Sequence, residues 1–317
     1  MCSPRSTNTK AILQALFVTF LWSTSWVLVK IALADIPALT FAGLRYTIAS
    51  LVLLPFVFQK KRFHSIRSLP PKMWGSLILL GVLFYSITQG TQFWALFYLP
   101  AATVSLLLNF TSIIVMVLSA IYLNEIPSKM QFAGVAIFIA GVLAFFYPLN
   151  VSQGSSIGLV IAGISVLANA LSSVLGRSIN RDSGLDAMSV TIVSMGVGSL
   201  ILLFVGVLVQ GLPPLSPQNW GIVLWLAIIN SAFAFTLWNH TLRVLPSTES
   251  SMINNTMLVQ IAFLAWIFLG ESLNWRELLG LGLATAGIMI VQFFSPTASA
   301  LQKDKSVETE NRISDSI

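Results

Sequence analysis

The feature that most constrains this chain is a succession of apolar stretches, each about 20 residues long, with few charges between them. Only 9% of the 317 residues are charged, whereas soluble domains average about 25%. An apolar helix of about 20 residues crosses the roughly 30 Å of bilayer hydrocarbon and satisfies its own backbone groups there. We therefore predict an all-α integral membrane protein. Its ten transmembrane helices are expected at residues 11–33, 39–58, 73–96, 101–122, 130–148, 157–176, 187–209, 219–242, 248–269 and 277–294.

Polar segments flank these spans. Arg5 and Lys10 precede the first apolar stretch, as they would in a signal peptide, but no small-residue cleavage site follows, so we interpret it as a membrane span. The tail from Ser295 is polar and mixed in charge, which is typical of disorder. A lone cysteine, Cys2, cannot form an internal disulfide. The predicted organisation is an N-terminal segment (1–10), two repeats (11–148 and 149–294) and a tail (295–317).

The formal net charge of +6 could suit a nucleic-acid partner, but the placement of the charges indicates membrane orientation instead. With the N-terminus inside, the outer segments hold only Lys30 and Arg276, and Arg45 lies within a span. The other fourteen basic residues fall in inner segments: Arg5, Lys10, Lys60, Lys61, Arg62, Arg67, Lys72, Lys129, Arg177, Arg181, Arg243, Lys303, Lys305 and Arg312. This positive-inside asymmetry predicts a plasma (bacterial inner) membrane protein with both ends cytoplasmic, a lipid bilayer as partner and no nucleic acid.

The second half of the chain repeats the first at an offset of 146 residues. The aligned identities include Trp74 with Trp220, Pro100 with Pro246, Asn109 with Asn255, Glu125 with Glu271, Gly134 with Gly280 and Gly141 with Gly287. Each half holds five spans, and an odd number makes the second half enter the bilayer from the opposite side. Such inverted repeats suit alternating access, although a duplication kept for packing alone would leave the same pattern.

The most similar segments are a charged turn followed by an apolar helix, Leu123–Leu143 and Leu269–Met289. Two pairs of residues have the spacing of a helix capping box, Ser128 with Gln131 and Asn274 with Glu277. The glycines of each half are seven apart, about two turns, so that they share one face and allow close helix approach. Glu125 and Glu271 lie in the interfacial turns, where we expect solvated or cap-bound carboxylates rather than transport groups.

The stretches LWSTSWVLVK (residues 21–30) and IPALTFAGLRY (36–46), with the two LxE…G…AG blocks, resemble the EamA family of the drug/metabolite transporter superfamily. The resemblance implies a ten-helix exporter or importer of small metabolites, often amino acids, with a central cavity. Of the two directions we predict export, also from the family. One departure stands out. The family commonly has a proline shortly after the positions of Asn109 and Asn255, but here the stretches read NFTSIIV and NTMLVQI.

Polar groups within spans usually face a bundle interior or a wet cavity. The mid-span set is rich in amides and hydroxyls: Ser23, Thr24, Ser25, Gln89, Gln92, Asn109, Asn169, Ser172, Ser173, Asn230, Asn239, Asn254 and Asn255. At 1.5 Å per residue, Asn109 lies ~12 Å below the outer end of its span and Asn255 ~10 Å above the inner end of its own. This amide pair brackets the midplane, where such transporters bind solute; hydrogen bonding between helices is the alternative.

Aromatic and amide residues complete the predicted substrate site. Trp22 and Trp26 share one helix face and could wall a cavity or hold an ammonium by cation–π attraction, although plain packing also explains them. Tyr85, Gln89 and Gln92 lie along one side of the third span. The predicted substrate-binding set is Trp22, Trp26, Tyr85, Gln89, Gln92, Asn109, Asn239 and Asn255.

Four charged or titratable residues are candidates for gating or coupling. Arg45, about 10 Å from the outer face, could meet a substrate carboxylate or bond to carbonyls at a helix end. Lys30 and Arg177 close the first span of each half and could gate or simply snorkel to the interface. His240 could serve a proton step or be structural.

The absence of certain charged residues from the spans limits the classes of solute that the protein could carry. No carboxylate lies mid-span, unlike the membrane glutamate of the small four-helix multidrug exporters, and no basic cluster suits a phosphate or nucleotide-sugar. A small neutral or zwitterionic solute remains, and the choice of an amino acid comes from the resemblance. A channel, a scaffold, or a carrier of a sugar, nucleotide-sugar or drug stays as an alternative.

Other classes of function find little support in the sequence. A Gly-rich phosphate loop, HExxH, GxSxG and a Cys/His cluster are all absent, so we predict no enzyme activity, no cofactor and no metal. The small-molecule substrate and the lipid are the expected partners, and we expect a monomer or weak homodimer.

Overall fold

The computed structural model describes residues 4–58, 60–123, 127–147, 153–182, 184–241, 245 and 247–294. Helices make up the regular structure of these residues. They are α1 Pro4–Ala32, α2 Ala38–Leu53, η1 Leu54–Phe58, α3 Lys60–Arg67, α4 Pro71–Leu80, η2 Gly81–Thr88, α5 Gln89–Tyr98, α6 Ala101–Leu108, α7 Phe110–Leu123, α8 Lys129–Phe146, α9 Gln153–Asp182, α10 Ala187–Gln210, α11 Pro217–Trp225, η3 Leu226–Phe233, α12 Ala234–Thr241, α13 Ser247–Leu269 and α14 Trp275–Phe293.

The predicted all-α membrane fold is confirmed. Within the described ranges, ten helical segments are long and apolar enough to cross a bilayer. Several large apolar side chains on them point outward, among them Phe204 at 66% and Leu208 at 68% exposure. A water-soluble protein rarely exposes so much contiguous apolar surface, whereas lipid accommodates it. The bounds agree with the predicted spans to within a few residues, with two exceptions. α1 begins at Pro4, ahead of the expected 11–33, and α9 runs past the expected 157–176 at both ends.

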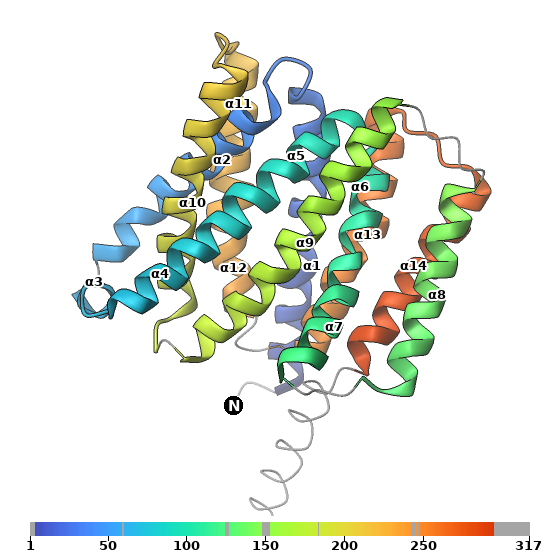
Figure 1. Ribbon diagram of the computed structural model, residues 1–317, viewed down its shortest axis with the longest axis horizontal. Coiled ribbons are helices and arrows are strands. Elements are labelled where there is room, and N and C mark those ends of the chain that lie inside the picture. The colour runs from blue at the N-terminus through green and yellow to red at the C-terminus, as the bar shows by residue number, and fades with distance from the viewer. Residues whose placement is uncertain are drawn as a thin grey trace, which may run out of the picture.

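The chain enters its two halves from opposite ends of the bundle (Figure 1). α1 begins at the lower end of the view, whereas α9 begins at the upper end, and α14 finishes at the lower end. The helices of the two halves interleave: α2 packs on α10, α1 on α13, and α8 on α14. The centre of the bundle therefore lies between the halves.

The third and eighth spans are not continuous α-helices. A π-helical segment, η2 or η3, interrupts each of them, and the two segments begin 145 residues apart (226 − 81). Because π turns displace carbonyls from the i→i−4 ladder, other groups can bond to them. Ser165 donates from Oγ to the Thr88 carbonyl at 2.9 Å. Trp22 donates from Nε1 to the Asn230 carbonyl at 3.0 Å. Neither π-helical segment was predicted from the sequence.

The four glycines that we predicted to allow close packing, Gly134, Gly141, Gly280 and Gly287, face one another between α8 and α14. A Cβ added at Gly134 would lie 2.8 Å from the Gly287 carbonyl oxygen, and one at Gly141 would lie 2.6 Å from that of Gly280. In the repeat, Gly134 corresponds to Gly280 and Gly141 corresponds to Gly287. The contact between Gly134 and Gly287 in one half is therefore equivalent to the contact between Gly280 and Gly141. We call these four residues the glycine interface.

Both predicted capping boxes position helix starts. Gln131 donates from its backbone N to Ser128 Oγ at 3.2 Å, and its side chain accepts from the Ser128 backbone at 2.9 Å. Glu277 accepts from the Asn274 backbone N at 2.7 Å. These bonds satisfy N–H groups that the first turns of α8 and α14 would leave unpaired.

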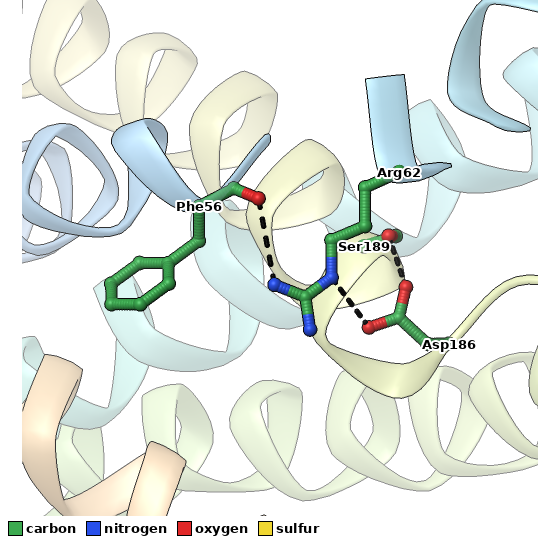
Figure 2. A network of polar contacts seen from close by, with 4 residues as sticks. All are labelled: Phe56, Arg62, Asp186 and Ser189. Atoms are coloured by element: carbon green, nitrogen blue, oxygen red, sulfur yellow. Dashed lines mark hydrogen bonds and ion pairs between the residues drawn. The ribbon is translucent and has the colours of Figure 1, made fainter. Parts of the chain in front are cut away.

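The basic segment after the second span forms the short helix α3, which contacts the start of α10 (Figure 2). Arg62 donates from Nε to Asp186 Oδ2 at 3.0 Å and from a terminal nitrogen to the Phe56 carbonyl at 3.4 Å. Ser189 donates to the other Asp186 oxygen. This polar cluster ties the two halves together at the surface.

Candidate functional site

A central cavity of about 400 Å³ lies between the two halves. Ten helical elements contribute to its lining: α1, α2, η2, α5, α6, α7, α9, α12, α13 and α14. The lining residues are Trp22, Ser25, Trp26, Arg45, Tyr46, Phe84, Gln89, Gln92, Ser105, Leu108, Asn109, Thr111, Ser112, Asn169, Phe235, Asn254, Asn255, Met257, Leu258, Ile261 and Gln292. The cavity reaches Gln292 in the last turn of α14, at the lower end of the bundle.

The cavity brings together most of the predicted substrate-binding residues. Those that line it are Trp22, Trp26, Gln89, Gln92, Asn109 and Asn255. Tyr85 does not line it; the side chain is buried, and its ring packs edge-on against Tyr46 with centroids 5.7 Å apart. Asn239 lies on α12, and its side chain falls outside the described part of the chain.

An amide relay joins three helices at the cavity wall. Asn255 on α13 donates from Nδ2 to Gln292 Oε1 at 2.8 Å, and Gln292 on α14 donates from Nε2 to Ser112 Oγ on α7 at 3.2 Å. Asn255 is buried, and the amides in this relay satisfy one another. The relay therefore couples one wall of the cavity to the helix that carries half of the glycine interface.

Asn109, the repeat partner of Asn255, is bonded differently. Its side chain donates to the Ser105 carbonyl of its own helix at 2.8 Å. The fourth span breaks at this residue, where α6 ends at Leu108 and α7 begins at Phe110, whereas α13 runs unbroken through Asn255. A tightened turn, with Asn109 N bonded to the Leu106 carbonyl, makes the break without the family's proline.

Aromatic side chains form part of the cavity wall. Tyr46 donates from its hydroxyl to Gln89 Oε1 at 2.7 Å, which orients the amide. The Trp22 ring lies 5.2 Å from Phe235 and 5.3 Å from Trp238, in tilted contacts that favour a fixed ring position. The cavity thus offers fixed apolar surfaces beside a few oriented polar groups, as ligand pockets do.

One cation lines the cavity. Arg45 on α2 is 5% exposed and donates from Nε to Ser231 Oγ at 3.2 Å. Its guanidinium carbon lies 5.2 Å from the Tyr46 ring centroid and 5.8 Å from that of Phe93. The part of the chain that the structure describes places no aspartate or glutamate beside it in the cavity lining.

Two charged residues outside the cavity lining bond to the backbone of the turn between α5 and α6. Lys30 donates from Nζ to the carbonyls of Leu96 and Leu99, the latter at 2.7 Å. Glu271 accepts from the backbone N of Ala101 at 2.8 Å, as the cap-bound carboxylate that we expected. Each charge complements the helix end that it meets. Glu125, the partner of Glu271, lies outside the described residues.

The other two candidates for gating or coupling lie away from the cavity. Arg177 and His240 are both exposed and absent from its lining. A gating or coupling role for either residue stays a prediction. Several mid-span polar groups also have structural bonds instead: Asn230 donates to the Leu21 carbonyl, Ser23 to the Thr19 carbonyl, and Ser172 and Ser173 to the Asn169 carbonyl.

Sequence reasoning missed part of the lining. Tyr46, Ser105, Thr111, Ser112 and Gln292 line the cavity but were not among the candidates. Gln292 was detectable as a lone amide within the last apolar span. The hydroxyls gave no signal, because serine and threonine on a membrane helix usually bond to their own backbone. No group of acidic, histidine or cysteine side chains that could hold a metal occurs in the described ranges.

A bundle of ten membrane-length helices around a polar cavity defines a membrane transport protein. The EamA-like transporter family matches residues 9–147 and again residues 154–293. Since the two matches cover most of the chain, this protein belongs to the EamA-like transporter family, within the drug/metabolite transporter superfamily.

Relatives of similar length support this assignment. The chain is 28% identical over 312 residues to "Uncharacterized transporter YvbV" of Bacillus subtilis, covering 95% of this chain and 96% of the relative. It is 28% identical over 292 residues to "Probable amino-acid metabolite efflux pump" of Salmonella typhimurium, with 88% and 93% covered. A solved crystal structure, 19% identical, has a TM-score of 0.65 and covers 91% of this chain and 99% of the other, which shows the fold alone.

Proposed function

We propose that this transporter is a secondary carrier that exports small neutral or zwitterionic metabolites, such as amino acids, by alternating access. The observation that carries the proposal is the central cavity, in which amides and aromatic rings from both halves surround about 400 Å³. That volume lies within the range of small-molecule sites. The name of the Salmonella relative, a probable amino-acid metabolite efflux pump, supports the choice of solute.

The two halves, residues 11–148 and 149–294, are proposed to be inverted repeats. In support, α1 and α9 begin at opposite ends of the bundle, and the glycine interface maps onto itself when its contacts are shifted by 146 residues. If the halves exchange conformations, an inward-open and an outward-open state have similar energies. The lysine and arginine asymmetry supports cytoplasmic ends, 1–10 and 295–317, in a bacterial inner membrane.

The test is exchange transport in proteoliposomes that contain the full chain. Vesicles loaded with the twenty unlabelled amino acids should accumulate a labelled amino-acid mixture by counterflow, and the rate should saturate. Metabolite profiling of the medium from expressing cells tests the direction, because an exporter should enrich the same solutes outside. A channel would pass solute without saturation or counterflow. If no amino acid moved, amino acids would be excluded as the transported solutes.

The double variant Asn109→Ala/Asn255→Ala tests the role of the repeated amides. We expect counterflow to fall about tenfold, the loss of roughly one hydrogen bond's worth of binding free energy. Asn180→Ala is the matched control, because Asn180 is exposed on α9 and bonds to the Gly176 carbonyl of its own helix. Saturable transport that is unchanged in the double variant would show that the amide pair only joins helices.

A further inference from the structure

We propose that Arg45 binds the carboxylate of the transported solute, so that the site selects small molecules carrying one carboxylate group. This role rests on the proposed function, because it assigns a group of the solute to a residue of the same cavity. It narrows the neutral or zwitterionic solutes of the proposed function to one chemical class, namely small zwitterions that carry a single carboxylate, such as amino acids.

Most of the hydrogen-bonding capacity of Arg45 is unused. A guanidinium group has five N–H donors in a fixed planar fork. Nε donates to Ser231 Oγ. The two terminal nitrogens carry the other four donors, and among the residues that the structure describes they have no hydrogen-bond partner. Since Arg45 is 5% exposed and lines the cavity, the cavity is where a solute can reach these donors.

The charge of Arg45 is equally uncompensated. Among the residues that the structure describes, the lining contains no aspartate or glutamate, and the ion pair of Arg62 with Asp186 lies at the surface. Contacts with the Tyr46 and Phe93 rings orient the guanidinium and attract it weakly, but they do not neutralise it. An unpaired charge inside a membrane bundle is costly, and an anion entering the cavity would remove that cost.

The number of cations distinguishes a carboxylate from a phosphate. A phosphate monoester carries about two negative charges near neutral pH, whereas Arg45 is the sole lysine or arginine among the described residues of the lining. One guanidinium pairs with one carboxylate through two parallel N–H···O bonds. Without a lining carboxylate, the amino group of a zwitterion would rely on amide oxygens and on the indole faces of Trp22 and Trp26, which line the same cavity.

The first experiment compares acids with amides on the unmodified full chain. Counterflow of the labelled amino-acid mixture is competed with an equimolar set of leucine, phenylalanine, methionine and alanine, or with the four corresponding amino-acid amides. The amides keep the amine and side chain but lose the anionic oxygens. Because an amide cannot form the charged pair with Arg45, the amides should compete about tenfold or more weakly than the acids. Amides that compete as well as the acids would overturn the proposal.

Variants then assign the preference to Arg45. In Arg45→Gln the ratio of acid to amide competition should fall to about one, and in Arg45→Lys, which keeps a point charge without the fork, it should fall only partly. Arg276→Gln is the matched control, since Arg276 lies against Tyr147 and Trp275 outside the cavity. A merely structural arginine would lower transport in Arg45→Gln without changing that ratio.

A binding measurement separates failure of this inference from failure of the proposed function. The thermal unfolding midpoint of the full chain in detergent is recorded with propionate, 4-methylpentanoate or 3-phenylpropionate, and with their neutral amides. Stabilisation by the acids that disappears in Arg45→Gln supports the carboxylate site even if no amino acid is transported. Equal effects of acids and amides, or no effect of either together with no selective competition, would refute it.

Discussion

The glycine interface and the central cavity are built from the same repeated sequence but have diverged to different extents. Between α8 and α14 the repeat keeps its glycines, so that the two helices meet backbone to backbone. Around the cavity the repeat is mostly lost: at an offset of 146, Gln89 corresponds to Phe235 and Gln92 to Trp238. Arg45 corresponds to Thr191 or Ile192 at offsets of 146 or 147, so its charge has no partner in the second half.

This contrast reflects two different requirements on the repeated sequence, helix packing and solute recognition. Symmetric packing needs the same small residues twice, because a side chain on either helix would push the other away. Recognition of an asymmetric solute needs different groups on its two sides, so the cavity gains from divergence. Asn109 and Asn255 are the same residue type at equivalent positions, but their bonding has diverged. Both line the cavity, yet Asn109 bonds to its own helix and Asn255 bonds to Gln292.

The largest expected effect comes from disturbing the glycine interface. A Cβ at Gly287 would lie 2.4 Å from the Phe138 backbone N and 2.6 Å from the Gly134 carbonyl oxygen, and neither atom can move alone. Gly287→Ala should therefore destabilise the folded protein by about 3 kcal/mol, at the upper end of ordinary overpacking. Thermal unfolding in detergent and the yield of monodisperse protein measure the effect.

Gly282→Ala is the control for this experiment, because it makes the same change on the same helix where a Cβ meets nothing within 4 Å. It should be neutral or slightly stabilising, since alanine favours a helix over glycine by about 1 kcal/mol. Equal loss in both variants would mean that α14 tolerates no substitution, and the close approach of α8 would then not explain the result.

Much of the fold, and less of the site, could be predicted from the sequence. Span positions follow from bilayer thickness and hydropathy, and the predicted Gly pairs and capping boxes follow from local rules, so these agree with the structure. The π segments do not, because their displaced carbonyls bond to other helices. The break at Asn109 does not either, because its tightened turn forms without a proline to mark it. Gln89 and Asn255 were found as amides in apolar surroundings, whereas Tyr85 was misplaced because helix rotation about its axis is set by packing.

An intermediate effect is expected at the relay between the two regions. Gln292→Leu removes both the acceptor of Asn255 and the donor to Ser112. Hydrogen bonds between membrane helices are worth about 0.6 kcal/mol each, so the loss of two should lower the free energy of unfolding by roughly 1 kcal/mol. Because Asn255 is freed within the cavity, counterflow should slow severalfold as well.

Gln218→Leu, on the exposed first turn of α11, is the matched control for the relay. It should change neither the free energy of unfolding nor the rate of counterflow. If Gln292→Leu altered stability but left counterflow at the parent rate, Asn255 would belong to the packing region and the boundary between the two regions would move inward. If counterflow alone changed, the relay would serve the solute rather than the helices.

The smallest effect should come from the surface contact between Arg62 and Asp186, which belongs to neither region (Figure 2). Their side chains are 23% and 39% exposed, and exposed ion pairs contribute about 0.2–1 kcal/mol. Arg62→Ala should lower the unfolding midpoint only slightly, and the difference should shrink further in high salt because mobile ions screen the pair. A loss as large as that of Gly287→Ala would show that the halves are joined at this surface as firmly as at the glycine interface. Symmetric backbone packing would then no longer be the feature that holds the duplicated halves together.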